Sequence, residues 1–118
     1  MTGTGRDTQA APLPELAEEL LKIHRETYGK GAERTDAYLL GDNVVCFLDD
    51  IELLPNEEFM IERDMEDAVV DIRQRYQEAV GDSFIAAVER STGRRVVSFL
   101  SRMSLSPHFV VEIFRLAP

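Results

Sequence analysis

The fold is decided by residues 35–48, which read TDAYLLGDNVVCFL. Two short apolar runs, Thr35–Leu40 and Val44–Leu48, are rich in residues that favour strands, and Gly41-Asp42-Asn43 separates them. All three separating residues tolerate a positive φ, so the stretch predicts a β-hairpin. Both strands carry apolar residues on both of their faces. Either both faces of this sheet are covered, or the outer face meets a partner.

A helix is predicted on the N-terminal side of the hairpin, over residues 14–28. Apolar residues recur there at spacings of four and three, which places them on one helical face. Pro14 suits the first turn of a helix, and the acidic residues that follow it complement the positive end of the helix dipole. The apolar face includes Leu16, Leu20 and Ile23.

Residues 1–12 show no periodicity and are expected to form a disordered tail, which leaves residues 13–118 as a single domain. Three glycines are expected to set the direction of the backbone within this domain. Gly29 and Gly93 each follow a helical stretch, where a residue in the left-handed conformation often ends the helix. Gly31 is expected to relax the connection into the hairpin.

A long helical pattern follows the hairpin, from Pro55 to about residue 91. An unbroken helix of this length would extend about 55 Å at 1.5 Å per residue, which is more than a domain of this size needs. We therefore expect a break near Arg63-Asp64 or near Gly81-Asp82-Ser83, where Asp or Ser could cap a new helix. The alternative is that the excess length packs against another subunit.

A second strand pair closes the chain, over residues 94–102 and 109–116. Strands that come in hairpin pairs, separated by helices, indicate an antiparallel sheet with helices packed on one side. The predicted fold is therefore a two-layer α+β domain. Its order is α-β-β-α(α)-β-β, with helices on one face of a four-stranded antiparallel sheet.

Composition limits the function classes. The 118 residues include 22 acidic and 13 basic ones, and the resulting net charge of −9 argues against a nucleic-acid partner, because that binding depends on neutralising phosphates. No apolar run approaches the ~20 residues of a membrane span, and the first residues lack the apolar core of a signal peptide. The single Cys46 cannot form an internal disulfide, which fits a reducing compartment. We expect a cytoplasmic domain without membrane insertion.

The sequence offers no catalytic constellation, since it has no Gly-rich phosphate loop, nucleophile elbow or zinc motif. Cys46 lies between apolar strand residues and is interpreted as a small buried residue. His24 and His108 lack a third metal ligand and are interpreted as structural or exposed. Asp49-Asp50-Ile51-Glu52 lacks the spacing and the Gly of a calcium loop. We therefore expect no enzymatic activity, no cofactor and no metal.

Acidic residues are concentrated in residues 42–71, which contain eleven acids and one base. Such a run is most often the solvated face of a helix, but it can also be a docking surface for a partner with a basic surface. The candidates for this interaction surface are Glu58, Glu62 and Glu66.

The one compact basic cluster surrounds Ser91-Thr92-Gly93 and consists of Arg90, Arg94 and Arg95. Basic side chains near the C-terminus of a helix stabilise its negative end, so capping is the simpler interpretation. The sharper hypothesis is that the three guanidinium groups bind a small anion.

Several motifs of the chain recur together in one small bacterial family. Tyr28-Gly29-Lys30-Gly31 follows the first helix, and Ser91-Thr92-Gly93-Arg94-Arg95-Val96 precedes the third strand. Residues 44–48, 52–57 and 111–116 complete the pattern. Over about residues 14–116 the chain resembles the MpsC-like proteins, which are named after a component of a proposed sodium-translocating, membrane-potential-generating system.

One position departs from this family pattern. The family usually has Leu-Thr-Pro before its second helix, where Thr would be the N-cap, and here Leu54 stands in place of the Thr. Because a Leu side chain cannot accept a hydrogen bond, the cap is expected to be lost or moved to Asn56.

The resemblance implies a soluble partner or accessory of a membrane system and supplies no catalytic residue. We interpret the chain as a non-enzymatic accessory domain, linked to membrane ion or bicarbonate transport, that contacts a basic protein partner or a membrane complex. A homodimer is expected from the long helical pattern and the apolar outer residues of the strands. The alternative is a regulatory domain that senses a small anion through Arg90, Arg94 and Arg95.

Overall fold

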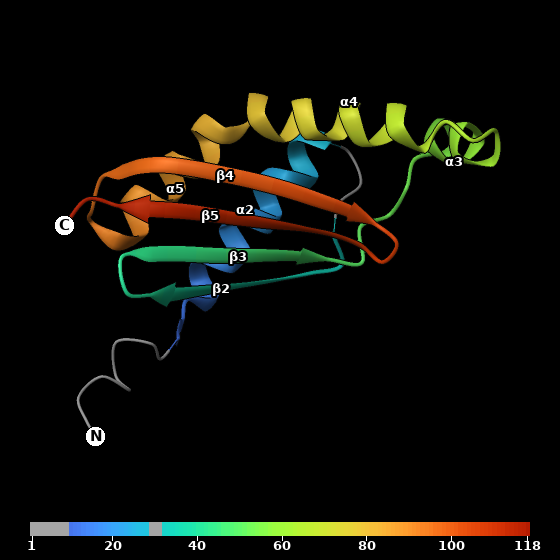
Figure 1. The fold of residues 1–118 in the computed structure, drawn as a ribbon. Coiled ribbons are helices and arrows are strands. Elements are labelled where there is room, and N and C mark those ends of the chain that lie inside the picture. Colours follow the sequence, from blue (N-terminus) through green and yellow to red (C-terminus); the bar gives the residue numbers. More distant parts are fainter. Residues whose placement is uncertain (1–9, 29–31) are drawn as a thin grey trace, which may run out of the picture.

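The computed structural model describes residues 10–28 and 32–118. The fold is α+β, with helices packed on an antiparallel sheet, as the sequence predicts (Figure 1). The elements in chain order are β1 (Ala11–Pro12), α2 (Pro14–Tyr28), β2 (Arg34–Leu40), β3 (Asn43–Asp49), α3 (Pro55–Glu62), α4 (Glu66–Ala79), α5 (Gly81–Thr92), β4 (Val96–Leu105) and β5 (His108–Leu116).

The sheet has the order β1-β2-β3-β5-β4, and every neighbouring pair is antiparallel. It has five strands where the sequence predicts four, because Ala11 and Pro12 pair with Leu39 and Tyr38. These two residues lie within the segment that was expected to be disordered. The second hairpin also differs in its bounds, since β4 begins at Val96 and runs on to Leu105.

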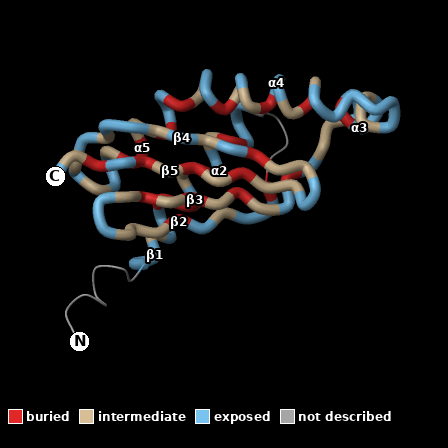
Figure 2. The backbone as a smooth tube through the Cα atoms, in the orientation of Figure 1, coloured by how far each residue is buried: buried red, intermediate tan, exposed pale blue. Residues whose placement is uncertain are grey.

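Helices α2 and α5 form a second layer behind one face of the sheet, whereas α4 runs beside β4 and α3 lies beyond the end of the sheet (Figure 1). Helix α2 lies along β2, where the Thr35 hydroxyl donates to the Ala17 carbonyl oxygen at 2.7 Å. Helices α4 and α5 contact β4. The core between the layers includes Leu20, Val44, Phe84 and Phe114, all fully buried (Figure 2).

The predicted long helix is broken at both of the expected positions. Helix α3 ends before Asp64, which has a φ of 61°, and α4 and α5 meet at Val80. The corner between α4 and α5 packs tightly on β4, because a Cβ added to Gly81 would lie 2.9 Å from the Phe99 ring. The excess length of a single helix therefore no longer argues for a second subunit.

The turns and caps follow from individual residues. Gly93 ends α5 with a φ of 69°, in the left-handed region. Gly29 and Gly31 lie outside the described residues. Helix α3 starts after Leu54, whose N–H donates to the Glu57 carboxylate at 2.7 Å. The expectation of a cap at Asn56 is wrong, because Asn56 lies inside the first turn and Glu57 reaches back to the helix start instead.

Candidate functional site

The face of the sheet that points away from the helices carries a continuous apolar patch, here called the open face. Alternate residues of β3 and β5 are buried against the helices, so the residues between them point to the other side. Among the described elements no helix covers this side (Figure 1). The apolar residues of the open face are Tyr38, Leu40, Val45, Phe47, Leu100, Phe109, Val111 and Ile113.

The strand register arranges the open face in rows that cross the sheet. One central row is apolar from edge to edge and consists of Tyr38, Val45, Ile113 and Leu100. Leu100, at the β4 end of this row, is 63% exposed. A row of this kind has the composition of a sheet face that packs on another layer.

The neighbouring row is apolar in the middle and charged at its ends. Phe47 and Val111 occupy its centre, Asp36 lies at the β2 end, and Arg102 lies at the β4 end. The two charges are therefore separated by the width of the sheet. This row gives the open face an acidic edge and a basic edge.

Two side chains bind backbone groups along the free edge of β4. Gln74 of α4 donates through Nε2 to the Ser101 carbonyl oxygen at 2.6 Å. Glu89 of α5 accepts from the Val96 N–H at 2.8 Å. Because backbone groups on an exposed edge invite pairing with another strand, these contacts protect β4.

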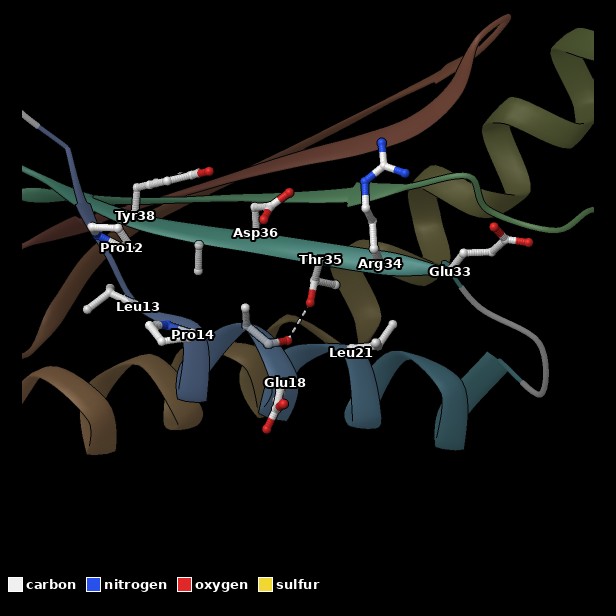
Figure 3. Close-up of a pocket in the computed structure, with 12 residues that line it drawn as sticks. Pro12, Leu13, Pro14, Glu18, Leu21, Glu33, Arg34, Thr35, Asp36 and Tyr38 are labelled. Carbon is white, nitrogen blue, oxygen red and sulfur yellow. Dashed lines mark hydrogen bonds between the residues drawn. The ribbon is translucent and has the colours of Figure 1, made fainter.

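The opposite edge of the sheet is only partly closed. Strand β1 pairs with Tyr38 and Leu39 alone, and the Leu13 N–H adds one bond to the Ala37 carbonyl oxygen at 2.8 Å. Beyond that point β2 and α2 enclose a groove of about 350 Å³, here called the edge groove (Figure 3). Its apolar lining is Leu13, Pro14, Ala17, Leu21 and Ala37.

The rim of the edge groove is acidic. Glu18, Glu33 and Asp36 line it, and none of their side chains has an ion-pair partner in the described part of the chain. Arg34 is the basic residue of the rim, but it pairs with Asp50 at 2.7 Å. The rim therefore carries uncompensated negative charge.

A buried ion pair joins α3 to α4. Arg73 donates through Nε and an Nη to the two carboxylate oxygens of Glu57, at 2.6 and 2.5 Å, and both residues are almost fully buried. Arg73 also donates to the Glu52 carbonyl oxygen at 3.2 Å. The sequence placed Glu57 within a solvated acidic run, and nothing local to it pointed to Arg73.

The positive charge of Arg73 acts on two histidines, His24 and His108. Burial, then Arg73, His108 and Arg25, lower the pKa of His24 from 6.5 to about 4. Burial and then Arg73 also lower the pKa of His108. Both imidazoles are thus neutral at pH 7. Within residues 10–28 and 32–118, no group of three or more His, Cys, Asp or Glu side chains is placed to hold a metal ion.

A carboxyl group lies inside the core at Glu112. Burial raises its pKa from 4.5 to about 8, although the Ser101 hydroxyl donates to it at 3.4 Å. Cys46 lies opposite Glu112 on β3, and burial followed by Glu112 raises the pKa of its thiol. The signal in the sequence is that Glu112 alternates in phase with Val110 and Phe114, the apolar residues of the buried face.

A comparison with protein families identifies the chain. The family described as the Na+-translocating membrane potential-generating system protein MpsC matches residues 12–118. The chain belongs to the MpsC family. No curated protein and no solved structure matches this MpsC-family chain. Across the described residues, it has no helix with the length and apolar character to cross a membrane.

The basic cluster of this MpsC-family chain is largely engaged by its own acids. Arg90 pairs with Glu19 of α2. Arg94 donates to Asp42 at 2.7 Å and to the Ala117 carbonyl oxygen at 2.6 Å. Arg95 is exposed. An anion bound here would have to displace carboxylates that already neutralise two of the three guanidinium groups.

The acidic candidates of the MpsC-family chain do not form one helical face. Glu58 and Glu62 lie on α3, whereas Glu66 begins α4. The break at residues 63–65 separates the two helices, so the helical spacing of the three residues is interrupted. All three remain exposed, and their role as an interaction surface stays a prediction.

Proposed function

We propose that this MpsC-family chain is a non-enzymatic accessory domain that works by protein–protein contact, in the type of membrane-potential-generating system for which its family is named. The observation that supports the proposal is the open face. An apolar sheet face without a covering layer is rare in a domain that works alone, because large exposed apolar patches mark interaction sites. The proposal assigns no catalytic role to any residue.

The first partner of the open face is a second copy of the chain. Four strands about 4.8 Å apart and four rows about 6.8 Å apart give roughly 500 Å² for each copy. Two such faces remove roughly 1,000 Å² from water, which is the lower limit for a specific interface. Sheets that pack face to face in this way keep their strands roughly aligned.

Charge favours one arrangement of the two copies. A two-fold axis parallel to the strands places β2 of one copy over β4 of the other. Asp36 of each copy then faces Arg102 of its partner across the interface. The alternative axis, perpendicular to the strands, places β2 over β2 and brings the acidic edges together, which is unfavourable.

The test is the mass of the particle in solution at micromolar concentration, measured by light scattering. We expect twice the 13.3 kDa of the chain. Ile113→Lys places a charge at the centre of the open face and should give the monomer mass. Ile72→Lys is the matched control, because Ile72 is 54% exposed on α4, away from that face. A wild-type chain of 13.3 kDa would overturn the proposed interface.

A further inference from the structure

We infer that the edge groove binds an extended segment of a partner protein, one in which basic and apolar residues alternate, by adding a strand beside β2. The inference rests on the proposed function only in treating the chain as a protein-binding domain. The groove lies between the edge of β2 and helix α2, and it shares only Asp36 with the rows of the open face (Figure 3).

The backbone of β2 is available along this groove. The bond from the Leu13 N–H shows that the Ala37 carbonyl points to the free edge. In an antiparallel strand every second residue directs its backbone groups to the same side, so those of Thr35 point there too. Strand β1 ends at Pro12 and α2 begins at Pro14, so the chain leaves the edge before it reaches Thr35.

The two edges of the sheet differ in how far their backbone groups are occupied. Gln74 and Glu89 occupy backbone groups along the β4 edge. On the outer edge of β2, the side away from β3, no described strand pairs with residues 34–37. An open edge is a liability for a protein in isolation, because it templates pairing with other chains. Leaving a single short edge open fits strand addition, a common mode of peptide recognition.

The lining and the rim determine the chemistry of the segment. Side chains of an added strand alternate between the two faces of the sheet. Those that point towards α2 meet the apolar surface of Ala17 and Leu21, with Glu18 at its margin. Those that point the other way meet Asp36, which projects from the opposite side of β2 (Figure 3). Alternating apolar and Lys or Arg residues satisfy both sides.

A second copy of the chain is a poor occupant of the groove. Pairing β2 with β2 of another copy about a two-fold axis at residue 36 would place Asp36 of one chain opposite Asp36 of the other. Like charges placed opposite each other in a sheet are destabilising. A segment from a basic partner avoids this repulsion and gains attraction instead.

The experiment uses a fluorescein-labelled peptide of sequence (Lys-Val)3-Lys and measures its anisotropy with the full chain. We expect saturable binding that weakens with salt. The double variant Glu18→Lys/Glu33→Lys should weaken binding roughly tenfold by charge repulsion. The control is Asp67→Lys/Glu78→Lys, which makes the same change of charge on exposed positions of α4 and should leave the affinity within about twofold.

The contribution of the backbone is tested by N-methylation. Two peptides carry methyl groups on alternate amides, one on each set. Strand addition uses the N–H groups of one set, so one peptide should lose binding and the other should keep it. Equal behaviour of the two peptides, equal losses in both protein variants, or no binding would overturn the inference.

The outcome can be separated from that of the proposed function. Ile113→Lys, the expected monomer, should bind the peptide as well as the wild type does. If Glu18→Lys/Glu33→Lys changes the mass of the particle in solution instead of peptide binding, the groove is an interface between copies, and the inference is wrong. If the wild type is a monomer but binds the peptide, the inference stands and the open-face dimer fails.

Discussion

Glu57 and Arg73 are sixteen residues apart and form a buried bidentate ion pair that fixes α3 against α4. The same carboxylate accepts the N–H of Leu54, so one side chain caps α3 and anchors it. Two charges removed from water are tolerated only when their hydrogen bonds are well satisfied. The pair therefore couples the start of α3 to the middle of α4, across the break at residues 63–65.

Breaking this pair should destabilise the domain more than its surface ion pairs would. Glu57→Gln keeps an oxygen for the Leu54 N–H but removes the charge, and leaves Arg73 charged in the interior. We expect a loss of about 3 kcal/mol in the free energy of unfolding, measured by urea melts. Glu58→Gln, on the next and exposed residue, should change it by less than about 0.5 kcal/mol. Equal effects of the two variants would show that the pair is not buried in solution.

Glu112 should make the domain less stable as the pH rises. Its pKa is raised by burial from 4.5 to about 8, so the folded chain holds a proton that the unfolded chain releases between these values. Its contribution is fully present below pH 4.5 and is lost as the pH rises through 8. As the pH rises from 4.5 to 7, the free energy of unfolding of Glu112→Gln should increase by on the order of 3 kcal/mol relative to that of the wild type.

The measurement for Glu112 is a series of urea melts across this range of pH. Glu78→Gln is the control, because Glu78 is exposed on α4. Its pH profile should run parallel to that of the wild type. A Glu112→Gln profile that also runs parallel would mean that the buried carboxyl keeps its ordinary pKa.

His24 should have the opposite effect. Its pKa is lowered by burial and by Arg73 from 6.5 to about 4. Between these pH values the unfolded chain binds a proton at His24 and the folded chain does not. The contribution of the neutral imidazole is fully present above pH 6.5 and is lost as the pH falls towards 4. As the pH falls over that range, the free energy of unfolding of His24→Phe should increase by roughly 3 kcal/mol relative to that of the wild type in the same melts. No relative gain would place the imidazole in water.

The parts of the fold that the sequence predicts are those with a local pattern. The periodicity of residues 14–28 gives α2 with its observed bounds, and the turn at Gly41-Asp42 gives the first hairpin. Strand β1 has two residues and no pattern of its own, because its existence depends on the edge of β2 that it pairs with. A long-range partner leaves no periodicity in a segment this short.

The candidate site is harder to predict from the sequence, because it too depends on residues that are far apart in the chain. The apolar outer residues of β2 and β3 predicted either a second covering layer or a face that meets a partner, and no described helix covers that face. The rows that place Asp36 and Arg102 at opposite ends need the register of four strands, which follows only from the folded sheet. The contact of Gln74 with the β4 edge likewise depends on where the break before α5 places α4.

Gly93 should be sensitive to substitution for backbone reasons alone. Its φ is 69°, and no atom lies within 4 Å of the position that a Cβ would take. Gly93→Val therefore meets no clash, yet it should cost about 1–2 kcal/mol in urea melts, because a side chain disfavours the left-handed conformation. Gly93→Asn should cost less, since Asn tolerates that conformation. If the Gly93→Val and Gly93→Asn variants are equally stable, Gly93 does not adopt the left-handed conformation in solution.

The last prediction concerns the two charges at the ends of the second row of the open face. In the proposed dimer Asp36 of each copy faces Arg102 of the other, so Asp36→Arg creates two contacts between like charges. We expect the dimer to dissociate at roughly tenfold higher protein concentration, measured by analytical ultracentrifugation. The double variant Asp36→Arg/Arg102→Asp restores opposite charges and should recover much of the loss, as coupled residues do in a mutant cycle. Asp71→Arg, on the exposed side of α4, is the control and should leave the dimer unchanged. If the double variant dissociates as readily as Asp36→Arg, the two-fold axis does not lie parallel to the strands.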